Sequence, residues 1–222
     1  MDLRHYLEYT NLSPVATVKD IDQTVAEATD LGLCGICIPP FWIKRARREI
    51  GSSNLTLVTV VGFPFGYQMT ETKQQEIALA IDNGADEIDL VWNISSFKTG
   101  MPWTKIELAK CSKLVHDKGK IIKIIIETGY LSEAEVVRAC KMCSDAGADF
   151  VKTSTGVTTA GATKEIVSLM KKALPSTVGI KASGGIKAYQ QAVDLIQAGA
   201  DRIGTSSAKE IIIQSNQKKN GR

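Results

Sequence analysis

The sequence predicts an α/β fold, a single-domain (β/α)8 TIM barrel, on three observations. Short apolar runs alternate with amphipathic stretches, which is typical of repeated strand–helix units around a parallel sheet. A Gly-Ala-Asp sequence at residues 84–86, 147–149 and 199–201 closes a helix before a strand each time. Eight strand–helix units fit the 222 residues, which is near the lower size limit of such a barrel.

The alternation also gives the order of the elements. Strands are expected at about residues 6–10, 33–38, 55–61, 86–92, 120–127, 149–153, 178–182 and 201–204. Helices between them are expected at residues 70–83, 132–146, 163–173 and 188–198. An open doubly wound sheet is the alternative architecture. It is disfavoured because no Gly-x-Gly-x-x-Gly motif follows the first strand and because the candidate site residues are spread over many strands.

The composition fits one domain. With 44% hydrophobic residues, residues 1–222 can bury one core without a break in composition, although the polar end from about residue 214 is expected to fray. The net charge is only +3, and we interpret the densest basic run, residues 44–48, as a solvated helix face rather than a nucleic-acid site. The chain begins without an apolar signal core and has no run of membrane-spanning length, so we expect a cytoplasmic protein without a membrane partner.

Five cysteines raise the question of a metal site. Cys34 and Cys37 lie three apart in a predicted strand, where they face opposite sides of the sheet. Cys140 and Cys143 lie in a predicted helix far downstream, unlike the ligands of a compact zinc module. We therefore interpret these thiols as small buried hydrophobes, and we expect neither a metal nor a cofactor.

Two lysines each end a short apolar run and precede small residues. Lys152 lies between Phe-Val and Thr-Ser-Thr-Gly, and Lys181 lies between Gly-Ile and Ala-Ser-Gly-Gly. A lysine late in a buried strand is expensive to desolvate, so its presence needs a reason. Two lysines in matching positions indicate a reactive amine with a second cation beside it, which points to carbonyl chemistry through a Schiff base.

Strand alternation brings further charges into the barrel. In residues 86–93, one face carries Ile88, Leu90 and Trp92 and is expected beneath the outer helices. The opposite face, together with alternate residues of the next three strands, is expected to point inward; this set contains Glu87, Asp89, Val91, Asn93, Lys123, Ile125, Glu127, Phe150, Lys152, Gly179, Lys181 and Ser183. The mixed charges can offset one another. Asp89, Lys152 and Lys181 are the candidate reactive groups, and the remaining charges are expected to support them.

Glycine-rich segments follow the last two predicted strands. Gly184 and Gly185 follow one of them, and Gly204, Ser206 and Ser207 follow the other, before a helix that begins near residue 208. In (β/α)8 barrels these two loops, with a helix N-terminus, commonly hold phosphate. The sequence therefore predicts a phosphorylated substrate.

With these segments identified, the chain resembles the deoxyribose-phosphate aldolases over nearly its whole length. The most specific matches are Val-Lys-Thr-Ser-Thr-Gly at residues 151–156 and Ile-Lys-Ala-Ser-Gly-Gly at 180–185. Further matches lie at residues 8–14, 61–66 with Lys73, 84–89 and 126–128. The resemblance implies a metal-independent class I aldolase that forms homodimers or homotetramers. Such an enzyme cleaves 2-deoxy-D-ribose 5-phosphate to D-glyceraldehyde 3-phosphate and acetaldehyde.

The resemblance also implies individual roles. Lys152 would be the Schiff-base lysine, Lys181 the second active-site lysine, and Asp89 the proton-transferring aspartate, with Glu8 and Lys123 in support. We expect Lys181, held cationic by Asp89 or Glu8, to favour the neutral form of Lys152. The positions where the family grips phosphate are Gly156, Gly184, Gly185, Gly204, Ser206 and Ser207.

Four positions depart from the family pattern. Tyr9 and Ser13 replace the frequent His and Lys of the opening motif, and Glu8 is a methylene longer than the frequent Asp. Val157 stands where some members carry a lysine on the phosphate side and others an apolar residue. We expect these changes to bear on phosphate affinity while the Asp89, Lys152 and Lys181 triad stays in place.

Three alternative functions remain open. A metal-dependent aldolase usually needs several histidines, and this chain has only two. Another Schiff-base aldolase, acting on a related sugar phosphate, would use the same barrel. A non-catalytic barrel that binds a phosphorylated metabolite is the third alternative, although a binding site would gain little from a desolvated amine.

Overall fold

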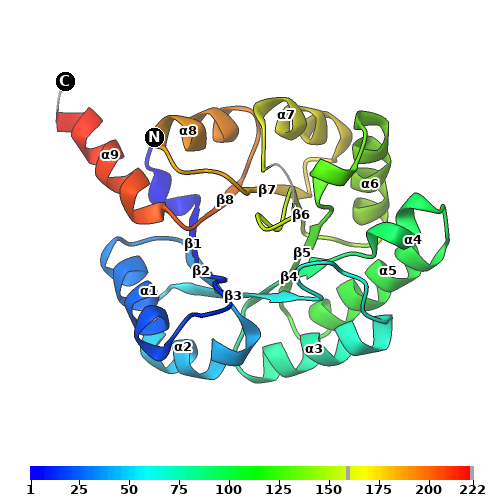
Figure 1. Ribbon diagram of the computed structural model, residues 1–222, viewed down its shortest axis with the longest axis horizontal. Helices are drawn as coiled ribbons and strands as arrows, with labels where there is room; N and C mark the ends of the chain where they lie inside the picture. Colours follow the sequence, from blue (N-terminus) through cyan, green and yellow to red (C-terminus); the bar gives the residue numbers. More distant parts are fainter. Residues whose placement is uncertain (159–160, 221–222) are drawn as a thin grey trace.

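The computed structural model describes residues 1–158 and 161–220. Eight parallel strands close into a barrel in the order of the sequence, and Figure 1 looks into the ring that they form. The strands are β1 Leu7–Thr10, β2 Gly35–Ile38, β3 Thr56–Val61, β4 Glu87–Val91, β5 Ile121–Ile125, β6 Phe150–Lys152, β7 Gly179–Ser183 and β8 Arg202–Thr205. The predicted barrel is confirmed, and the closed ring excludes the open sheet.

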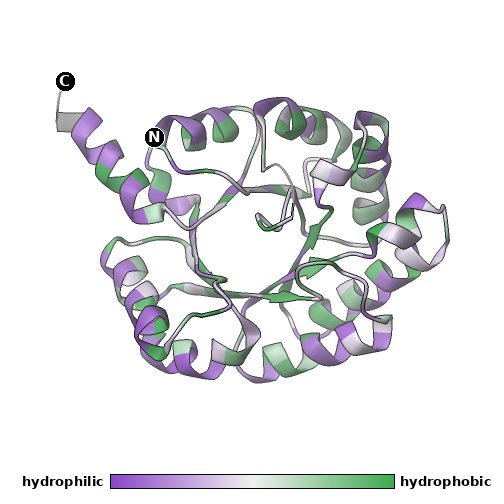
Figure 2. Cartoon of the chain, in the orientation of Figure 1, coloured by the Kyte–Doolittle hydropathy of each residue, from purple (hydrophilic) through white to green (hydrophobic). Residues whose placement is uncertain are grey.

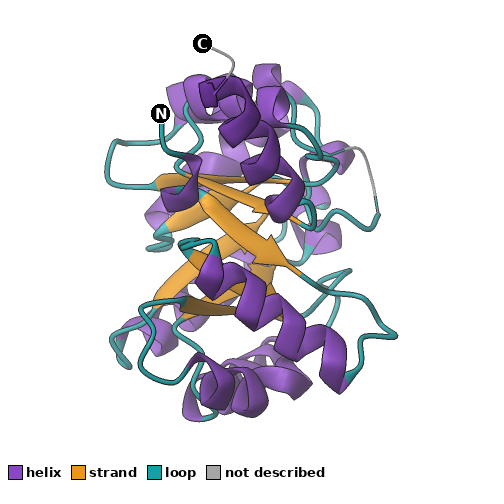
Figure 3. Cartoon of the chain, turned by 90° about the vertical axis from the view of Figure 1, so that its left-hand side faces the viewer, coloured by secondary structure: helices purple, strands orange, loops and turns teal. Residues whose placement is uncertain are grey.

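Helices surround the ring of strands in Figure 1, and Figure 3 shows them above and below the strands at the centre. They are α1 Val18–Asp30, α2 Ile43–Ile50, α3 Thr70–Asp82, α4 Ile94–Lys98, α5 Trp103–His116, α6 Glu133–Asp145, α7 Lys164–Ala173, α8 Tyr189–Gln197 and α9 Ala208–Asn220. The four predicted helices are confirmed as α3, α6, α7 and α8. Three of the predicted ranges begin at the N-cap residue, and in two of them the N-cap side chain, Ser132 or Thr163, accepts from a backbone N–H group of the first turn.

The main apolar core lies between the strands and the helices. Ile88 and Leu90 on β4, and Trp92 directly after it, are fully buried in this layer, as strand alternation predicts. Figure 2 shows the same division, with hydrophobic strands such as β3 to β5 inside helices of mixed character. Inside the ring, a small apolar cluster of Cys37, Val58 and Val60 occupies only the side of β2 and β3. On the interior side of β4 and β5, the charged groups Asp89 and Lys123 are fully buried beside the apolar Val91 and Ile125.

The repeated Gly-Ala-Asp sequence joins neighbouring strands. The carboxylates of Asp86, Asp149 and Asp201 accept from the backbone N–H groups of Leu57, Ile122 and Ile180, at 3.0, 2.8 and 2.9 Å respectively. In each copy the glycine has a positive φ, which lets the chain leave the helix and turn into the strand. Each aspartate thus satisfies the first free donor of the preceding strand, and this arrangement explains why the sequence recurs.

Replacing Asp149 with alanine tests this role. Ile122 is fully buried, and its N–H would lose the Asp149 carboxylate as its acceptor. We expect the free energy of unfolding to fall by about 1–2 kcal/mol, at the lower end for an unpaired buried donor because Asp149 itself is partly exposed. Urea denaturation followed by circular dichroism measures the change, and a midpoint equal to that of the wild type would refute the role.

The polar C-terminal end, expected to fray from about residue 214, belongs mostly to helix α9. Helix α9 continues to Asn220, and residues 221–222 lie outside the described part. Its apolar residues Ile211 and Ile212 are buried, and the Gln214 side chain accepts from the Tyr189 N–H at 2.8 Å. Because these contacts hold the first half of the helix, the polar residues that follow continue it outward from the barrel (Figure 1).

The basic run at residues 44–48 forms helix α2, as predicted. Its Arg47 binds the Gly84 carbonyl and the Asp86 carboxylate of the neighbouring unit.

The expectation that Asn93 lies inside the barrel is wrong. Asn93 lies beyond the end of β4 and caps α4, because its side chain accepts from the Ser96 N–H at 3.0 Å. In the described ranges, none of the helices combines the length and apolar character needed to cross a membrane.

Candidate active site

Four neighbouring strands bring three lysines around one aspartate. Asp89 on β4 is in register with Lys123 on β5, and Lys152 on β6 is in register with Lys181 on β7. Asp89 Oδ2 lies 2.8 Å from Lys152 Nζ and 2.7 Å from Lys181 Nζ. Asp89 Oδ1 lies 3.1 Å from Lys123 Nζ. The alternation of side chains along each strand therefore collects these groups inside the barrel.

Two glutamates complete this buried charge cluster. Glu8 on β1 forms an ion pair with Lys181 and lies 3.6 Å from the Lys123 Nζ. Glu87 on β4 forms an ion pair with Lys123. The cluster thus contains three lysines and three carboxylates, all of them buried. Removal of one member leaves a buried charge without compensation, which is costly, so the cluster depends on its balance.

The charges of the cluster shift one another's ionisation. Burial alone would lower the pKa of Lys181, but the carboxylates of Asp89 and Glu8 outweigh it and raise this pKa well above its ordinary value. Burial alone would raise the pKa of Asp89, but Lys123, Lys152 and Lys181 outweigh it and hold this pKa well below its ordinary value. Around neutral pH, Lys181 is therefore a cation and Asp89 an anion.

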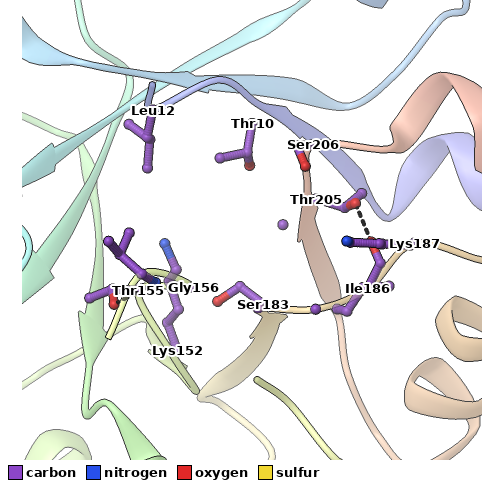
Figure 4. Close-up of a pocket in the computed structure, with 14 residues that line it drawn as sticks. Thr10, Leu12, Lys152, Thr155, Gly156, Ser183, Ile186, Lys187, Thr205 and Ser206 are labelled. Carbon is purple, nitrogen blue, oxygen red and sulfur yellow. Dashed lines mark hydrogen bonds between the residues drawn. The ribbon is translucent and has the colours of Figure 1, made fainter. Parts of the chain in front are cut away.

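A cavity of about 210 Å³ opens above the cluster at the carboxyl ends of the strands. Figure 4 shows the Lys152 side chain reaching into it from β6, while Thr10 and Leu12 lie on the opposite wall. Lys181, Lys123 and Asp89 lie beneath and do not line it. A carbonyl compound that enters the cavity therefore meets the Lys152 amine, with Asp89 and Lys181 directly behind it.

The loops after β6, β7 and β8 form the remainder of the wall. Of the six positions predicted to grip phosphate, five line the cavity: Gly156, Gly184, Gly185, Gly204 and Ser206. Ser207 does not line it, and its N–H donates to Thr205 Oγ1 at 2.9 Å. Gly184 and Gly204 have little room for a side chain, since a Cβ on them would lie 2.8 Å from Gly161 Cα and 3.1 Å from Lys181 Cε, respectively. The arrangement suits a ligand with a carbonyl at one end and an anion at the other.

Comparison with known proteins identifies the family. The model of the DeoC/LacD family aldolases matches residues 1–213. The chain belongs to this aldolase family. Deoxyribose-phosphate aldolase from Thermococcus gammatolerans is 44% identical over 215 residues, which cover 96% of each chain. Deoxyribose-phosphate aldolase from Thermotoga petrophila is 46% identical over 211 residues, which cover 95% of this chain and 85% of the relative.

Solved structures of aldolases share the fold. The structure of QR15, an aldolase, matches with a TM-score of 0.94 and 36% identity, covering 99% of this chain and 98% of the other. Deoxyribose phosphate aldolase from Aeropyrum pernix, described as a unique tetrameric structure, matches with a TM-score of 0.91 and 32% identity, covering 97% of this chain and 92% of the other.

The positions that depart from the family pattern lie mostly outside the cavity. The Tyr9 hydroxyl donates to Glu27 Oε2 at 3.1 Å, and burial with this contact raises the pKa of Tyr9 to about 12. Ser13 belongs to an exposed turn, where its Oγ accepts from the Val15 N–H at 3.3 Å. Val157 does line the cavity, with 64% of its surface exposed. Of the three, only Val157 is placed to alter ligand affinity directly.

Several residues of the wall were not predicted from the sequence: Thr10, Leu12, Thr155, Ile186, Lys187 and Thr205. Lys187 matters most among them, because it adds a positive charge to the side of the cavity where phosphate is expected. A signal for it was present, since Lys187 comes two residues after Gly185 in a loop already assigned to phosphate. Lys187 and Val157 both line the cavity.

In the part of the chain that the structure describes, the cysteines and histidines are not grouped at one site. Cys37, Cys111, Cys140 and Cys143 are buried, and burial raises the pKa of the Cys37 thiol to about 11. His116 instead contacts Asp149 Oδ2 at 2.9 Å. Over residues 1–158 and 161–220, no group of three or more His, Cys, Asp or Glu side chains has the arrangement to hold a metal ion.

Proposed function

We propose that the protein is a deoxyribose-phosphate aldolase that cleaves 2-deoxy-D-ribose 5-phosphate reversibly through a Schiff base on Lys152. The observation that carries the proposal is the position of the Lys152 amine, which reaches the cavity while paired with Asp89. The glycine loops and Lys187 on the other side of the cavity suit the phosphate. The names of the related enzymes support the same substrate.

Lys152 has the fewest carboxylate contacts of the three lysines in the cluster. Among the described residues it contacts one carboxylate, whereas Lys181 contacts two and Lys123 contacts three. Lys181, which shares Asp89 Oδ2 with Lys152, and Lys123 are fully buried and do not line the cavity. Lys152 is therefore the one amine of the cluster placed to attack a carbonyl compound in the cavity.

The chemistry then follows from the position of the substrate aldehyde. The Lys152 amine adds to the first carbon of the open-chain sugar, and loss of water gives an iminium. The iminium draws electrons from the bond between the second and third carbons, because the hydroxyl on the third carbon lies β to it. That hydroxyl loses its proton as glyceraldehyde 3-phosphate departs. The remaining enamine is protonated on carbon, and hydrolysis releases acetaldehyde and the free lysine.

Asp89 is suited to move protons during these steps. Its Oδ2 lies 2.8 Å from the Lys152 Nζ, within reach of the nitrogen that gains and loses protons as the adduct forms and breaks down. Lys181, held by Asp89 and Glu8, keeps a positive charge beside the reacting nitrogen. Glu8 contacts Lys181, and Lys123 contacts Asp89, so that these contacts hold Lys181 and Asp89 in place. Neither Glu8 nor Lys123 lines the cavity.

The test is an assay of purified protein with 2-deoxy-D-ribose 5-phosphate, in which a coupled dehydrogenase reports release of glyceraldehyde 3-phosphate. We expect turnover, and we expect it to persist in excess EDTA. Loss of activity in EDTA with recovery on addition of zinc would favour a metal-dependent aldolase. Cleavage of a different sugar phosphate alone would favour another Schiff-base aldolase. Binding without turnover would favour a non-catalytic role.

The proposal includes an assembly of two or four copies in solution. The related aldolase from Aeropyrum pernix is described as tetrameric, which supports this part of the proposal. Exposed large apolar side chains on the loop after β3 and at the start of α5 also suit burial between copies, namely Phe65, Tyr67, Met69 and Trp103.

A further inference from the structure

Glu127 is a buried acidic residue that the mechanism above does not use. It follows β5 at the end of the barrel where the cavity opens, and its side chain is fully buried. Its backbone has φ 41° and ψ 70°, and no other non-glycine residue in the described ranges has a positive φ. L-residues rarely adopt this conformation, and such outliers persist where the surrounding structure requires them.

The Glu127 carboxylate binds the loop that follows Lys152. Glu127 Oε1 accepts from the Ser154 hydroxyl at 2.9 Å. Glu127 Oε2 accepts from the Thr155 N–H at 3.1 Å and also from the Thr155 hydroxyl. Strand alternation predicted that this side chain points inward, but not that the left-handed backbone turns it toward the next loop. One carboxylate thus joins the end of β5 to two consecutive residues after β6.

These bonds determine the direction of two hydroxyl protons. An ionised carboxylate only accepts, so both hydroxyls must donate to it and present their oxygens to other donors. The Ser154 Oγ accordingly accepts from the Gly156 N–H at 2.9 Å, and the Thr155 Oγ1 accepts from the Val157 N–H at 3.3 Å. Each of these two bonds closes a short turn between a side chain and the backbone, and the two turns together define the backbone conformation of residues 154–157.

The folded loop forms the wall on the phosphate side. Gly156 and Val157 line the cavity, and a Cβ built on Gly156 would lie 3.5 Å from the Gly184 Cα of the loop after β7. Ser183 ties the two loops together, because its hydroxyl donates to the Ser154 carbonyl at 2.5 Å. A displacement of residues 154–157 would therefore change the space beside Gly184, where the phosphate is expected.

Lys152 is held by separate contacts. Its carbonyl accepts from the Ile126 N–H at 3.0 Å, and its amine is held by Asp89. The strand β7 fixes the position of Lys152 through its register with Lys181. A change at the Glu127 carboxylate should thus move the loop while the reactive amine stays in place.

We propose that Glu127 is a positioning residue which, through Ser154 and Thr155, shapes the loop after β6 and thereby sets the preference for a phosphorylated over an unphosphorylated sugar. The proposal rests on the proposed function, since it assumes that the phosphate lies beside Gly156 and Gly184. Glu127 itself does not line the cavity and does not touch the reacting atoms.

The test compares Glu127→Gln with the wild type. An amide keeps the size of the side chain but replaces one acceptor oxygen with a donor, so one hydroxyl loses its acceptor. We expect the ratio of kcat/KM for 2-deoxyribose 5-phosphate to that for 2-deoxyribose to fall roughly 10- to 100-fold, mainly through KM for the phosphorylated sugar. The borohydride-trapped adduct with acetaldehyde should form as in the wild type.

The matched control is Glu107→Gln, the same change at another buried glutamate. Glu107 accepts from Lys73 Nζ at 2.8 Å on the outer side of the barrel and does not line the cavity. This variant should lose stability without a change in the ratio. If Glu127→Gln lowers both kcat/KM values equally, its role is only structural and the proposal is wrong.

Two further measurements keep the proposal testable. If Glu127→Gln does not fold, Thr155→Val removes one of the two hydroxyls at nearly constant volume and should lower the same ratio. If the wild type does not cleave the sugar phosphate, the proposed function fails, but calorimetry with inorganic phosphate still tests the loop. Weaker phosphate binding by Glu127→Gln than by Glu107→Gln would support the role of Glu127, and equal binding would overturn it.

Discussion

Lys152→Ala should abolish both cleavage and adduct formation. Without the amine, no iminium forms to accept the electrons of the breaking bond, so we expect kcat to fall by roughly 10⁴-fold or more. Incubation with acetaldehyde and borohydride should fix one ethyl group on the wild type and none on the variant, as read by mass spectrometry of the intact chain. Peptide mapping should place the modification in residues 150–156.

Lys187→Ala is the matched control for this experiment. Lys187 is the second lysine on the wall of the cavity, so an aldehyde that enters can also meet its amine. Acetaldehyde has no phosphate, and Lys187 lies outside the charge cluster, so this variant should still form the adduct. An adduct that persists in Lys152→Ala and disappears in Lys187→Ala would transfer the role of nucleophile to Lys187.

The strand positions and the inward lysines could be predicted because they follow from local periodicity. Alternation along a strand decides which side chains share a face, and closure of a parallel barrel brings these faces together. For this reason Asp89, Lys152 and Lys181, which lie far apart in the sequence, could be expected in one place. The contacts among them could not be assigned in advance, because register and side-chain reach decide that all three lysines meet the same carboxylate.

The unpredicted features depend on contacts between distant segments. The Tyr9 hydroxyl donates to Glu27 Oε2. The other oxygen, Glu27 Oε1, forms an ion pair with the Lys209 Nζ of α9 at 2.6 Å. This contact helps to attach the first turn of α9 to the barrel. The turn at Glu127 likewise depends on donors from the next strand's loop, which no local pattern in residues 120–128 reveals. Local sequence patterns therefore predicted the helices and strands, but not the side-chain contacts that connect distant segments.

Asp89→Asn should destabilise the fold and also slow the reaction. The amide keeps the shape of the side chain but removes the negative charge among three buried lysines, so we expect the free energy of unfolding to fall by about 3–5 kcal/mol at neutral pH. The folded-state pKa of Asp89 is lowered, so its contribution to stability is fully present above the unfolded pKa of about 3.9 and is lost as the pH falls through the folded value. The difference between wild type and variant in urea denaturation should consequently narrow below about pH 4.

The control variant Glu107→Gln separates the effect of Asp89→Asn on stability from its effect on the reaction rate. It breaks the buried Lys73–Glu107 ion pair, which lies outside the cavity, and should cost a similar amount of stability. At a temperature where all proteins are folded, we expect kcat to stay near the wild-type value in Glu107→Gln and to fall roughly 10²- to 10⁴-fold in Asp89→Asn. Equal kcat in the two variants would mean that Asp89 only balances charge, and proton transfer at Lys152 would then require another group or a water molecule in the cavity.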